Sequence, residues 1–242
     1  MITTVKGIVL HHVNYSESSV ILQAYTDRFG RLSVMINSIR GKRTRLSMNM
    51  IQPLSLVEFE IYYKQNRDIQ RIRDMSNPVQ YHSIPYRIEK STQAMFMAEI
   101  LYKTLREEEA NAALFDFLIN AVQVLDLLEI NISSFHLVFL VQLSKFLGFY
   151  PRNNFKGEEC FFDLRGGQFA SLPLSHPDYL DKELSELIHK LLRINLKDLE
   201  SVEAGGFART TLVDAIVHYY NLHITGFGKV RSLPVLREIL SQ

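Results

Sequence analysis

Hydrophobic residues recur at two different spacings, and the change between them divides the chain. Up to about residue 76 they alternate with polar residues, which is typical of strands that bury one face. In one such segment Leu32, Val34 and Ile36 lie on one face, while Arg31 and Ser33 lie on the other. Gly, Asn, Asp and Ser residues separate the predicted strands. The strands are expected at residues 5–13, 18–26, 30–37, 54–63 and 67–75.

Five short strands in succession favour a small closed barrel, because closure leaves no exposed strand edge. A barrel of the oligonucleotide/oligosaccharide-binding (OB) type has this number of strands, and an SH3-like barrel fits the same count. We therefore predict an N-terminal barrel domain over residues 1–79.

Helical spacing replaces the alternation after Asn77 and Pro78, where apolar residues such as Met95, Ala98 and Leu101 follow at intervals of three and four. One helix is expected there. Five more are expected at residues 110–129, 133–148, 181–192, 209–222 and 233–240. Ser133 or Ser134 is expected to cap the helix that Gly148 ends. The predicted fold class is thus multidomain α and β, with an OB-type barrel followed by an α-helical bundle over residues 80–242.

Residues 149–180 interrupt the helical pattern with several prolines and the pair Gly166 and Gly167. The segments on either side of these glycines, FFDL at residues 161–164 and QFA at residues 168–170, predict a hairpin. We expect this segment to be a small insertion in the helical domain.

The charge is polarised along the chain, although the formal net charge is only +1. Residues 1–79 hold 11 Lys and Arg against 6 Asp and Glu, whereas the rest of the chain is net acidic. Such a division suggests a polyanion-binding module joined to a domain with another task. The longest apolar stretches, residues 121–128 and 137–143, are shorter than the roughly 18 residues of a membrane span. The first residues predict a strand instead of a secretory signal, so we expect a cytoplasmic protein with no membrane partner.

We find no sequence motif for catalysis. The nearest approach to a phosphate-binding loop, residues 226–231, has neither the required length nor the hydroxyl residue. The histidines are scattered, and Cys160 is the only cysteine, so neither a disulfide nor a cysteine zinc site is expected. We therefore expect no enzymatic activity, no cofactor and no metal.

A basic loop between the third and fourth predicted strands is the best candidate for a binding site. It places Arg40, Lys42, Arg43 and Arg45 around Gly41, where they could follow a phosphate backbone, although a merely solvated loop would have the same composition. OB barrels combine such cations with aromatic residues that stack on bases. The available aromatic residues are Tyr25, Phe29, Tyr62 and Tyr63, of which Phe29 and Tyr63 are better explained as core. The residues predicted to bind DNA are Arg28, Arg31, Arg40, Lys42, Arg43, Arg45, Tyr62, Arg71, Arg73, Arg209, Lys229 and Arg231.

Four sequence segments in this order resemble the RecO family of bacterial recombination mediators. They are residues 14–19 (NYSESS), 25–32 (YTDRFGRL), 40–43 (RGKR) and 52–54 (QPL). The resemblance implies an OB domain, binding of single- and double-stranded DNA, and annealing of strands. It also implies help in loading RecA onto DNA that is covered by single-stranded-DNA-binding protein, with RecR and the acidic tail of that binding protein as partners, near the nucleoid.

The chain departs from the family pattern at two places. Some members carry a four-cysteine zinc site in the insertion, whereas this chain has only Cys160 there, so we expect packing of Phe161, Phe162 and Phe169 to replace the metal. The family can carry arginines near the start of the third helix, where this chain has His136. The residues predicted for the partner peptide are therefore His136 and Lys145.

Two other functions fit the same residues. An RNA-binding barrel would use the same stacking and phosphate contacts. An adaptor without nucleic-acid binding would use the helical domain for protein partners and the basic loop for solubility.

Overall fold

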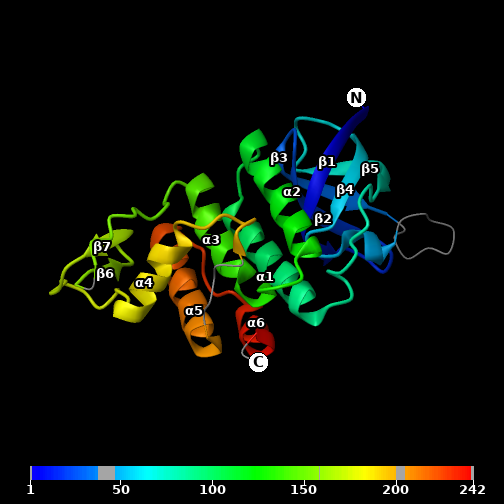
Figure 1. Ribbon diagram of the computed structural model, residues 1–242. Helices are drawn as coiled ribbons and strands as arrows, with labels where there is room; N and C mark the ends of the chain where they lie inside the picture. Colours follow the sequence, from blue (N-terminus) through cyan, green and yellow to red (C-terminus); the bar gives the residue numbers. More distant parts are fainter. Residues whose placement is uncertain (1, 38–46, 158, 200–204, 241–242) are drawn as a thin grey trace. The chain divides into compact units, whose positions relative to one another are not determined.

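The computed structural model describes residues 2–37, 47–157, 159–199 and 205–240 (Figure 1). Its contacts divide the chain into two compact units. The first unit comprises Met1–Arg87 and Gln93–Asp126, and the second comprises Ile88–Thr92 and Leu127–Gln242. The first unit therefore contains the barrel together with most of two helices, α1 and α2. The division at residue 79 remains a prediction.

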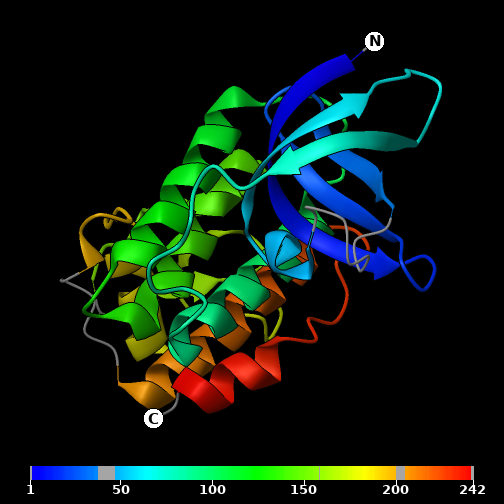
Figure 2. The same ribbon diagram turned by 90° about the vertical axis from the view of Figure 1, so that its right-hand side faces the viewer.

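The barrel of the first unit has the five predicted strands in the order β1-β2-β3-β5-β4, closed between β4 and β1. All neighbours are antiparallel except β3 and β5. The long strand β1 closes the barrel, because its first half pairs with β4 and its second half pairs with β2 (Figure 2). This arrangement confirms the OB-type barrel. The strands are β1 (Ile2–Asn14), β2 (Val20–Thr26), β3 (Gly30–Ile36), β4 (Leu56–Tyr62) and β5 (Ile69–Ser76).

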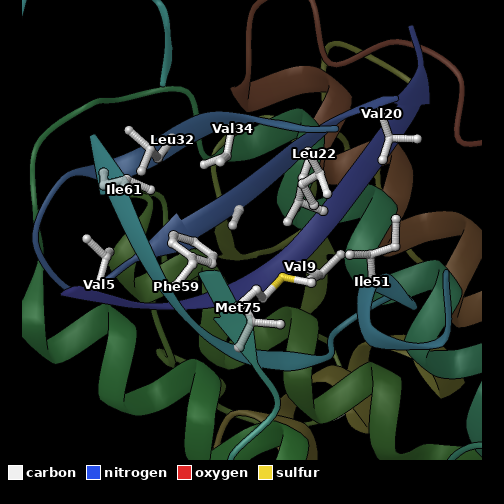
Figure 3. Packing of buried hydrophobic residues seen from close by; sticks show 13 residues of the cluster. Val5, Val9, Val20, Leu22, Leu32, Val34, Ile51, Phe59, Ile61 and Met75 are labelled. Atoms are coloured by element: carbon white, nitrogen blue, oxygen red, sulfur yellow. The ribbon is translucent and has the colours of Figure 1, made fainter. Parts of the chain in front are cut away.

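Alternate residues of the five strands fill the interior of the barrel (Figure 3). Leu22, Val34 and Ile61 are completely buried, as is Ile51 from the short 3-10 helix η1 (Met48–Ile51). Each such aliphatic side chain contributes roughly 1.5 to 3 kcal/mol through burial. The alternation leaves the intervening residues of each strand on the outer wall of the barrel.

Two helices complete the first unit: α1 (Ile88–Thr104), from Gln93 onwards, and α2 (Ala112–Leu127), up to Asp126. Asp126 lies near the end of α2, and its carboxylate accepts hydrogen bonds from the backbone N–H groups of His82, Ser83 and Ile84. These bonds fix the segment that follows the barrel.

The second unit is helical around α3 (Phe135–Phe146), most of whose residues are buried. Ser134 occupies the N-cap position of α3, but its side chain makes no capping bond. Gly148 ends the helix with a positive φ of 83°, and the N–H of Phe149 bonds back to the carbonyl of Ser144, as expected of a glycine stop. The other elements are η2 (Ile132–Ser134), β6 (Phe161–Asp163), β7 (Gln168–Ala170), α4 (Lys182–Leu191), α5 (Gly206–His223) and α6 (Leu233–Leu240).

The predicted hairpin is present as β6 and β7 and packs on helices of the second unit. Phe162 and Phe169 are buried and meet at 5.2 Å between ring centres, whereas Phe161 is only half-buried. Phe155 is the third ring, 5.2 Å from Phe169, so the expected aromatic cluster is correct in two of its three members.

Polar contacts also hold the insertion. The carboxylate of Asp178 accepts hydrogen bonds from Arg165 and, at 2.9 Å, from His218 of α5. These bonds lower the pKa of Asp178, with His218 as the larger cause. A second pair, Asp163 and His176, lies 3.4 Å apart. Within the described parts of the chain, no three His, Cys, Asp or Glu side chains converge as metal ligands would.

No helix within the described ranges has the length and apolar character that crossing a membrane requires.

Candidate nucleic-acid interface

The outer wall of the barrel carries a continuous row of side chains that passes from strand to strand. Tyr62 of β4 pairs with Arg71 of β5, which in turn pairs with Met35 of β3. The row continues to Ile21 of β2 and Val13 of β1, and on its other side Tyr62 pairs with Ile2. We call these six residues the outer row: Ile2, Tyr62, Arg71, Met35, Ile21 and Val13.

The loop between β4 and β5 carries exposed cations next to this row. Gln70 is buried, and its side-chain amide donates to the carbonyls of Lys64 and Arg67 and accepts from the N–H of Lys64. These three bonds hold the loop in shape while both basic side chains point to solvent. Sequence reasoning missed Lys64 and Arg67. The available signal was the charge of residues 63–73, which hold four cations and one acid.

Arg71 and Arg73 are both exposed on β5, as predicted, but their surroundings differ. Arg73 forms an ion pair with Glu60 at 3.2 Å, whereas the strand neighbours of Arg71 are the uncharged Tyr62 and Met35. Arg71 is therefore better placed to meet a phosphate. The carboxylates of Glu58 and Glu60 lie further along β4, away from the loop.

Tyr62 is the best placed of the four candidate aromatic residues. Its side chain is 46% exposed, while Tyr25 is only 3% exposed and packs beside Phe115 of α2. Phe29 and Tyr63 stack on each other at 4.3 Å and cover the core, as the sequence indicated. The structure therefore removes Tyr25 from the stacking candidates.

Arg31 does not present its guanidinium to a ligand, which corrects its assignment as a DNA contact. Its Nη1 donates to the carbonyls of Tyr102, at 3.0 Å, and Leu105, and its Nη2 donates to Gln23. The guanidinium also lies 4.4 Å from the ring centre of Tyr102. These contacts bind β3 to the end of α1 within the first unit, so the role of Arg31 is structural.

The turn that precedes Arg31 is built for the same contact. The Thr26 hydroxyl donates to the carbonyl of Gly30 and accepts from the N–H of Phe29. Gly30 has a positive φ of 58°, and a Cβ atom there would overlap the carbonyl oxygens of Glu107 and Glu109. Two features therefore require a glycine at position 30: the positive φ angle, and the carbonyl oxygens that leave no room for a Cβ atom. Arg28, at the tip of the turn, remains exposed.

The four cations of the basic loop, Arg40, Lys42, Arg43 and Arg45, lie outside the described residues. The described chain stops at Asn37, directly after β3, and resumes at Ser47, directly before η1. Val20 of β2 pairs with Ile36 there, and the Ser19 hydroxyl bonds to the side chain of Asn37.

Three predicted DNA contacts belong to the second unit. Lys229 and Arg231 are exposed in the segment between α5 and α6. Arg209 is half-buried, and its Nη2 donates to the carbonyl of Leu240 at 3.0 Å. Burial lowers the pKa of Arg209. This corrects the assignment of Arg209, because its side chain joins α5 to the end of α6.

His136 is buried in the second unit and lines a small cavity there. Its side chain is 2% exposed, and burial, together with the positive charge of Arg209, lowers its pKa to about 3. The imidazole is thus neutral at physiological pH and cannot attract an acidic peptide. Lys145, in the last turn of α3, is exposed and stays a candidate.

Comparison with known proteins gives matches over nearly the whole chain. The family profile "Recombination protein O N terminal" matches residues 1–78, and "Recombination protein O C terminal" matches residues 85–234. The chain is 36% identical to the DNA repair protein RecO of Phocaeicola vulgatus over 100% of both chains. It is 33% identical to that of Azobacteroides pseudotrichonymphae and 35% identical to that of Bacteroides fragilis, each over 99% of both chains.

Proposed function

Because the chain belongs to the RecO family of DNA repair proteins, we propose that it acts as a non-catalytic mediator of homologous recombination. In this role it binds single- and double-stranded DNA, promotes annealing, and helps to load RecA onto DNA covered by single-stranded-DNA-binding protein. We propose residues 1–79 as the DNA-binding module and residues 80–242 as the module for protein partners, with RecR among them. Such a protein would work in the cytoplasm, associated with the nucleoid.

One observation supports DNA binding best, namely the gathering of cations beside an exposed aromatic ring on an OB barrel. Lys64 and Arg67 are exposed in the loop that follows Tyr62, and Arg71, which is also exposed, is the direct strand neighbour of Tyr62. Cations of this kind bind phosphates without reading sequence, and an aromatic side chain accepts any base. Arg28, Arg73, Lys229, Arg231 and the four cations of the basic loop extend the proposed set.

The salt dependence of DNA binding tests the basic loop. Each cation that meets a phosphate of a single strand releases a counterion and contributes about 0.7 to the slope of log affinity against log salt concentration. Replacing Arg40, Lys42, Arg43 and Arg45 together with Ala should therefore flatten the slope by up to about 3. The dependence of affinity on base sequence should stay the same, because phosphate contacts do not read bases.

A matched control removes the same charge elsewhere. Lys156, Lys190, Arg193 and Lys197 are exposed in the second unit and belong to neither proposed site, so their replacement with Ala should leave the slope nearly unchanged. If both variants flatten the slope equally, net charge governs binding and the loop has no special role. If the loop variant keeps the wild-type slope and melting temperature, the loop is only solvated.

The type of nucleic acid separates the remaining alternatives. Binding of single-stranded DNA, duplex DNA and RNA should be compared at one salt concentration. Preference for RNA would favour the RNA-binding barrel. Dissociation constants weaker than about 10⁻⁴ M for all three would favour the adaptor.

For the acidic tail of single-stranded-DNA-binding protein, we propose a site in the second unit. Such a tail needs an apolar pocket with cations at its rim. A small cavity there is lined by His136, Val213, Leu236 and Leu240, with Arg209 and Arg237 beside them. Arg237 also forms an ion pair with Asp214 at 3.2 Å. The predicted residue His136 thus lies in the wall of this cavity as an uncharged side chain, and Lys145 is a further cation to be tested.

Calorimetry with the full chain and a peptide that ends in acidic residues followed by Pro-Phe tests this site. Arg237→Ala should weaken binding, whereas the control Arg193→Ala, on an exposed residue that does not line the cavity, should not. Equal affinity in both variants would place the peptide elsewhere.

A further inference from the structure

We infer that the outward face of α2 is a docking surface for a second copy of this chain, with the two α2 helices antiparallel and a two-fold axis near Asn120. This inference goes beyond the proposed function and does not depend on it, because it concerns protein molecules in the absence of DNA. A dimer of this kind would carry two barrels, and with them two of the proposed DNA-binding modules.

The spacing of residues along α2, which is labelled in Figure 1, is the first step. The buried residues of the helix lie on one side. On the other side five residues in line are exposed or half-buried, and we call them the α2 seam: Ala113, Phe117, Asn120, Val124 and Leu127. Their spacing of 4, 3, 4 and 3 residues averages 3.5, which is the repeat by which one helix packs along another. Leu127 is 69% exposed, so the apolar end of the seam lies open.

The shortage of charge on α2 is the second step. Its only charged residues are Asp116 and Asp126, and Asp126 is buried and bonded to the segment that follows the barrel. Helix α4, by contrast, has four Lys or Glu residues among ten. The solvent face of a surface helix ordinarily carries charged residues. A face with a single charge and an exposed leucine is therefore better explained as a surface that a protein partner covers.

The order of residues in the seam decides which partner fits. When the seam is reversed and laid on itself about Asn120, the small Ala113 meets the large Leu127, and Phe117 meets Val124. Asn120 meets its own copy, and an asparagine at one position of such a seam fixes the register of the two helices. An unrelated partner would not require this symmetry. The match of the seam with its own reverse therefore points to a second copy.

Asp116 decides the orientation. In a parallel pair the two Asp116 carboxylates would lie directly opposite each other and repel. In the antiparallel pair Asp116 faces the uncharged Val124, eight positions further along. Eight residues of helix span about 12 Å, which exceeds the screening length of about 8 Å at physiological salt. The antiparallel arrangement thus avoids the only like-charge contact that the seam could make.

The size of the seam sets the expected affinity. A helix of 16 residues is about 24 Å long, and one pair of such helices buries less surface than a stable interface of standard size. We therefore expect a dissociation constant on the order of tens of micromolar.

Sedimentation of the full chain without DNA, between about 1 and 200 µM, tests for the dimer. The variant Leu127→Glu should weaken it by at least about tenfold, because each dimer covers two copies of this leucine. Leu222→Glu is the matched control, since Leu222 is an exposed leucine of another helix, α5, and its replacement should leave dimerisation unchanged. The melting temperature of each variant shows whether it is folded.

Disulfide formation tests the antiparallel orientation. In a Cys160→Ser background, Asn120→Cys places a thiol near the two-fold axis and should form a dimer under mild oxidation. Ala113→Cys should not, because the two thiols would lie about 21 Å apart along the helices, far beyond the roughly 7 Å that a disulfide can span between Cα atoms.

Each result supports or overturns the inference. A protein that stays monomeric over the whole concentration range would overturn it, as would a dimer that Leu127→Glu leaves intact. Equal crosslinking through Ala113→Cys and Asn120→Cys would show a parallel pair and would also overturn it. All these measurements are made without DNA, so their failure leaves the proposed DNA binding untouched.

Discussion

The buried imidazole of His136 should make the stability of the helical unit depend on pH. Burial and the charge of Arg209 lower the pKa of His136 to about 3, whereas a histidine in an unfolded chain titrates near 6.5. Between these values the unfolded state holds a proton that the folded state does not. The contribution of His136 to stability is therefore complete above pH 6.5 and is lost as the pH falls towards 3.

The magnitude follows from linkage. One proton taken up only on unfolding changes the free energy of unfolding by about 1.4 kcal/mol per pH unit below pH 6.5. Between pH 7 and pH 5 the loss is thus about 2 kcal/mol, which is a large part of an ordinary stability of 5 to 15 kcal/mol. Burial also lowers the pKa of His11 and His189, and these two histidines act in the same direction.

Urea unfolding at pH 7 and pH 5, followed by circular dichroism of the helices, tests this prediction. The variant His136→Leu should lose about 2 kcal/mol less than wild type between the two pH values, whatever its absolute stability, because the other histidines remain in both proteins. A double difference of this kind removes the effect of repacking around the new side chain. Equal pH dependence in the two proteins, or an imidazole signal of His136 that titrates near pH 6.5 by NMR, would refute the reasoning.

Four further predictions concern the barrel turn and the insertion. Gly30→Ala should destabilise the protein by more than about 1 kcal/mol in urea unfolding, since its backbone angle and its contacts both exclude a Cβ atom. Arg31→Ala should lower the melting temperature and leave the slope of DNA affinity against salt concentration unchanged. A flatter slope would show that Arg31 does contact DNA. Asp178→Asn should lower the melting temperature near neutral pH. The difference from wild type should vanish at a pH well below 4. The reason is that the pKa of Asp178 is lowered, so the carboxylate stops contributing to stability only when it becomes protonated. Treatment with a chelator should leave the melting temperature unchanged, whereas loss of a stoichiometric zinc with a lower melting temperature would contradict our expectation for the insertion.

The elements themselves were predictable because each one buries a single face. The third strand was expected at residues 30–37 and spans Gly30–Ile36, and the hairpin was expected around Gly166 and Gly167 and lies there. Helix α5 was expected from residue 209 and begins at Gly206. Alternation and helical spacing are local properties of the chain, so they can be recognised without knowledge of its partners in space.

The role of an outward residue was not predictable in the same way. Arg31 and Arg71 both face outward from strands of one barrel, and both are arginines after an alternating pattern. They differ because the guanidinium of Arg31 is bonded to the carbonyls of Tyr102 and Leu105. These two residues follow Arg31 by some seventy positions in the sequence. A contact at such a sequence separation leaves no periodic signal, so both arginines were assigned to DNA.

The residues between Thr26 and Arg31 are the easiest to recognise in the sequence, but they say little about ligands because they serve the fold. The residues between Thr26 and Arg31 carry much of the family resemblance, and the structure explains them by architecture: a hydroxyl that closes the turn, a glycine without room for a side chain, and a guanidinium bonded to backbone carbonyls. Each of these demands one residue type. A phosphate contact needs only a positively charged side chain long enough to reach the phosphate. Lys64 and Arg67 meet this requirement, in a loop whose shape is held by the buried side chain of Gln70. Strict motifs in this chain therefore identify the fold, whereas the proposed phosphate contacts have to be sought among positions where the charge and the exposure matter more than the residue type.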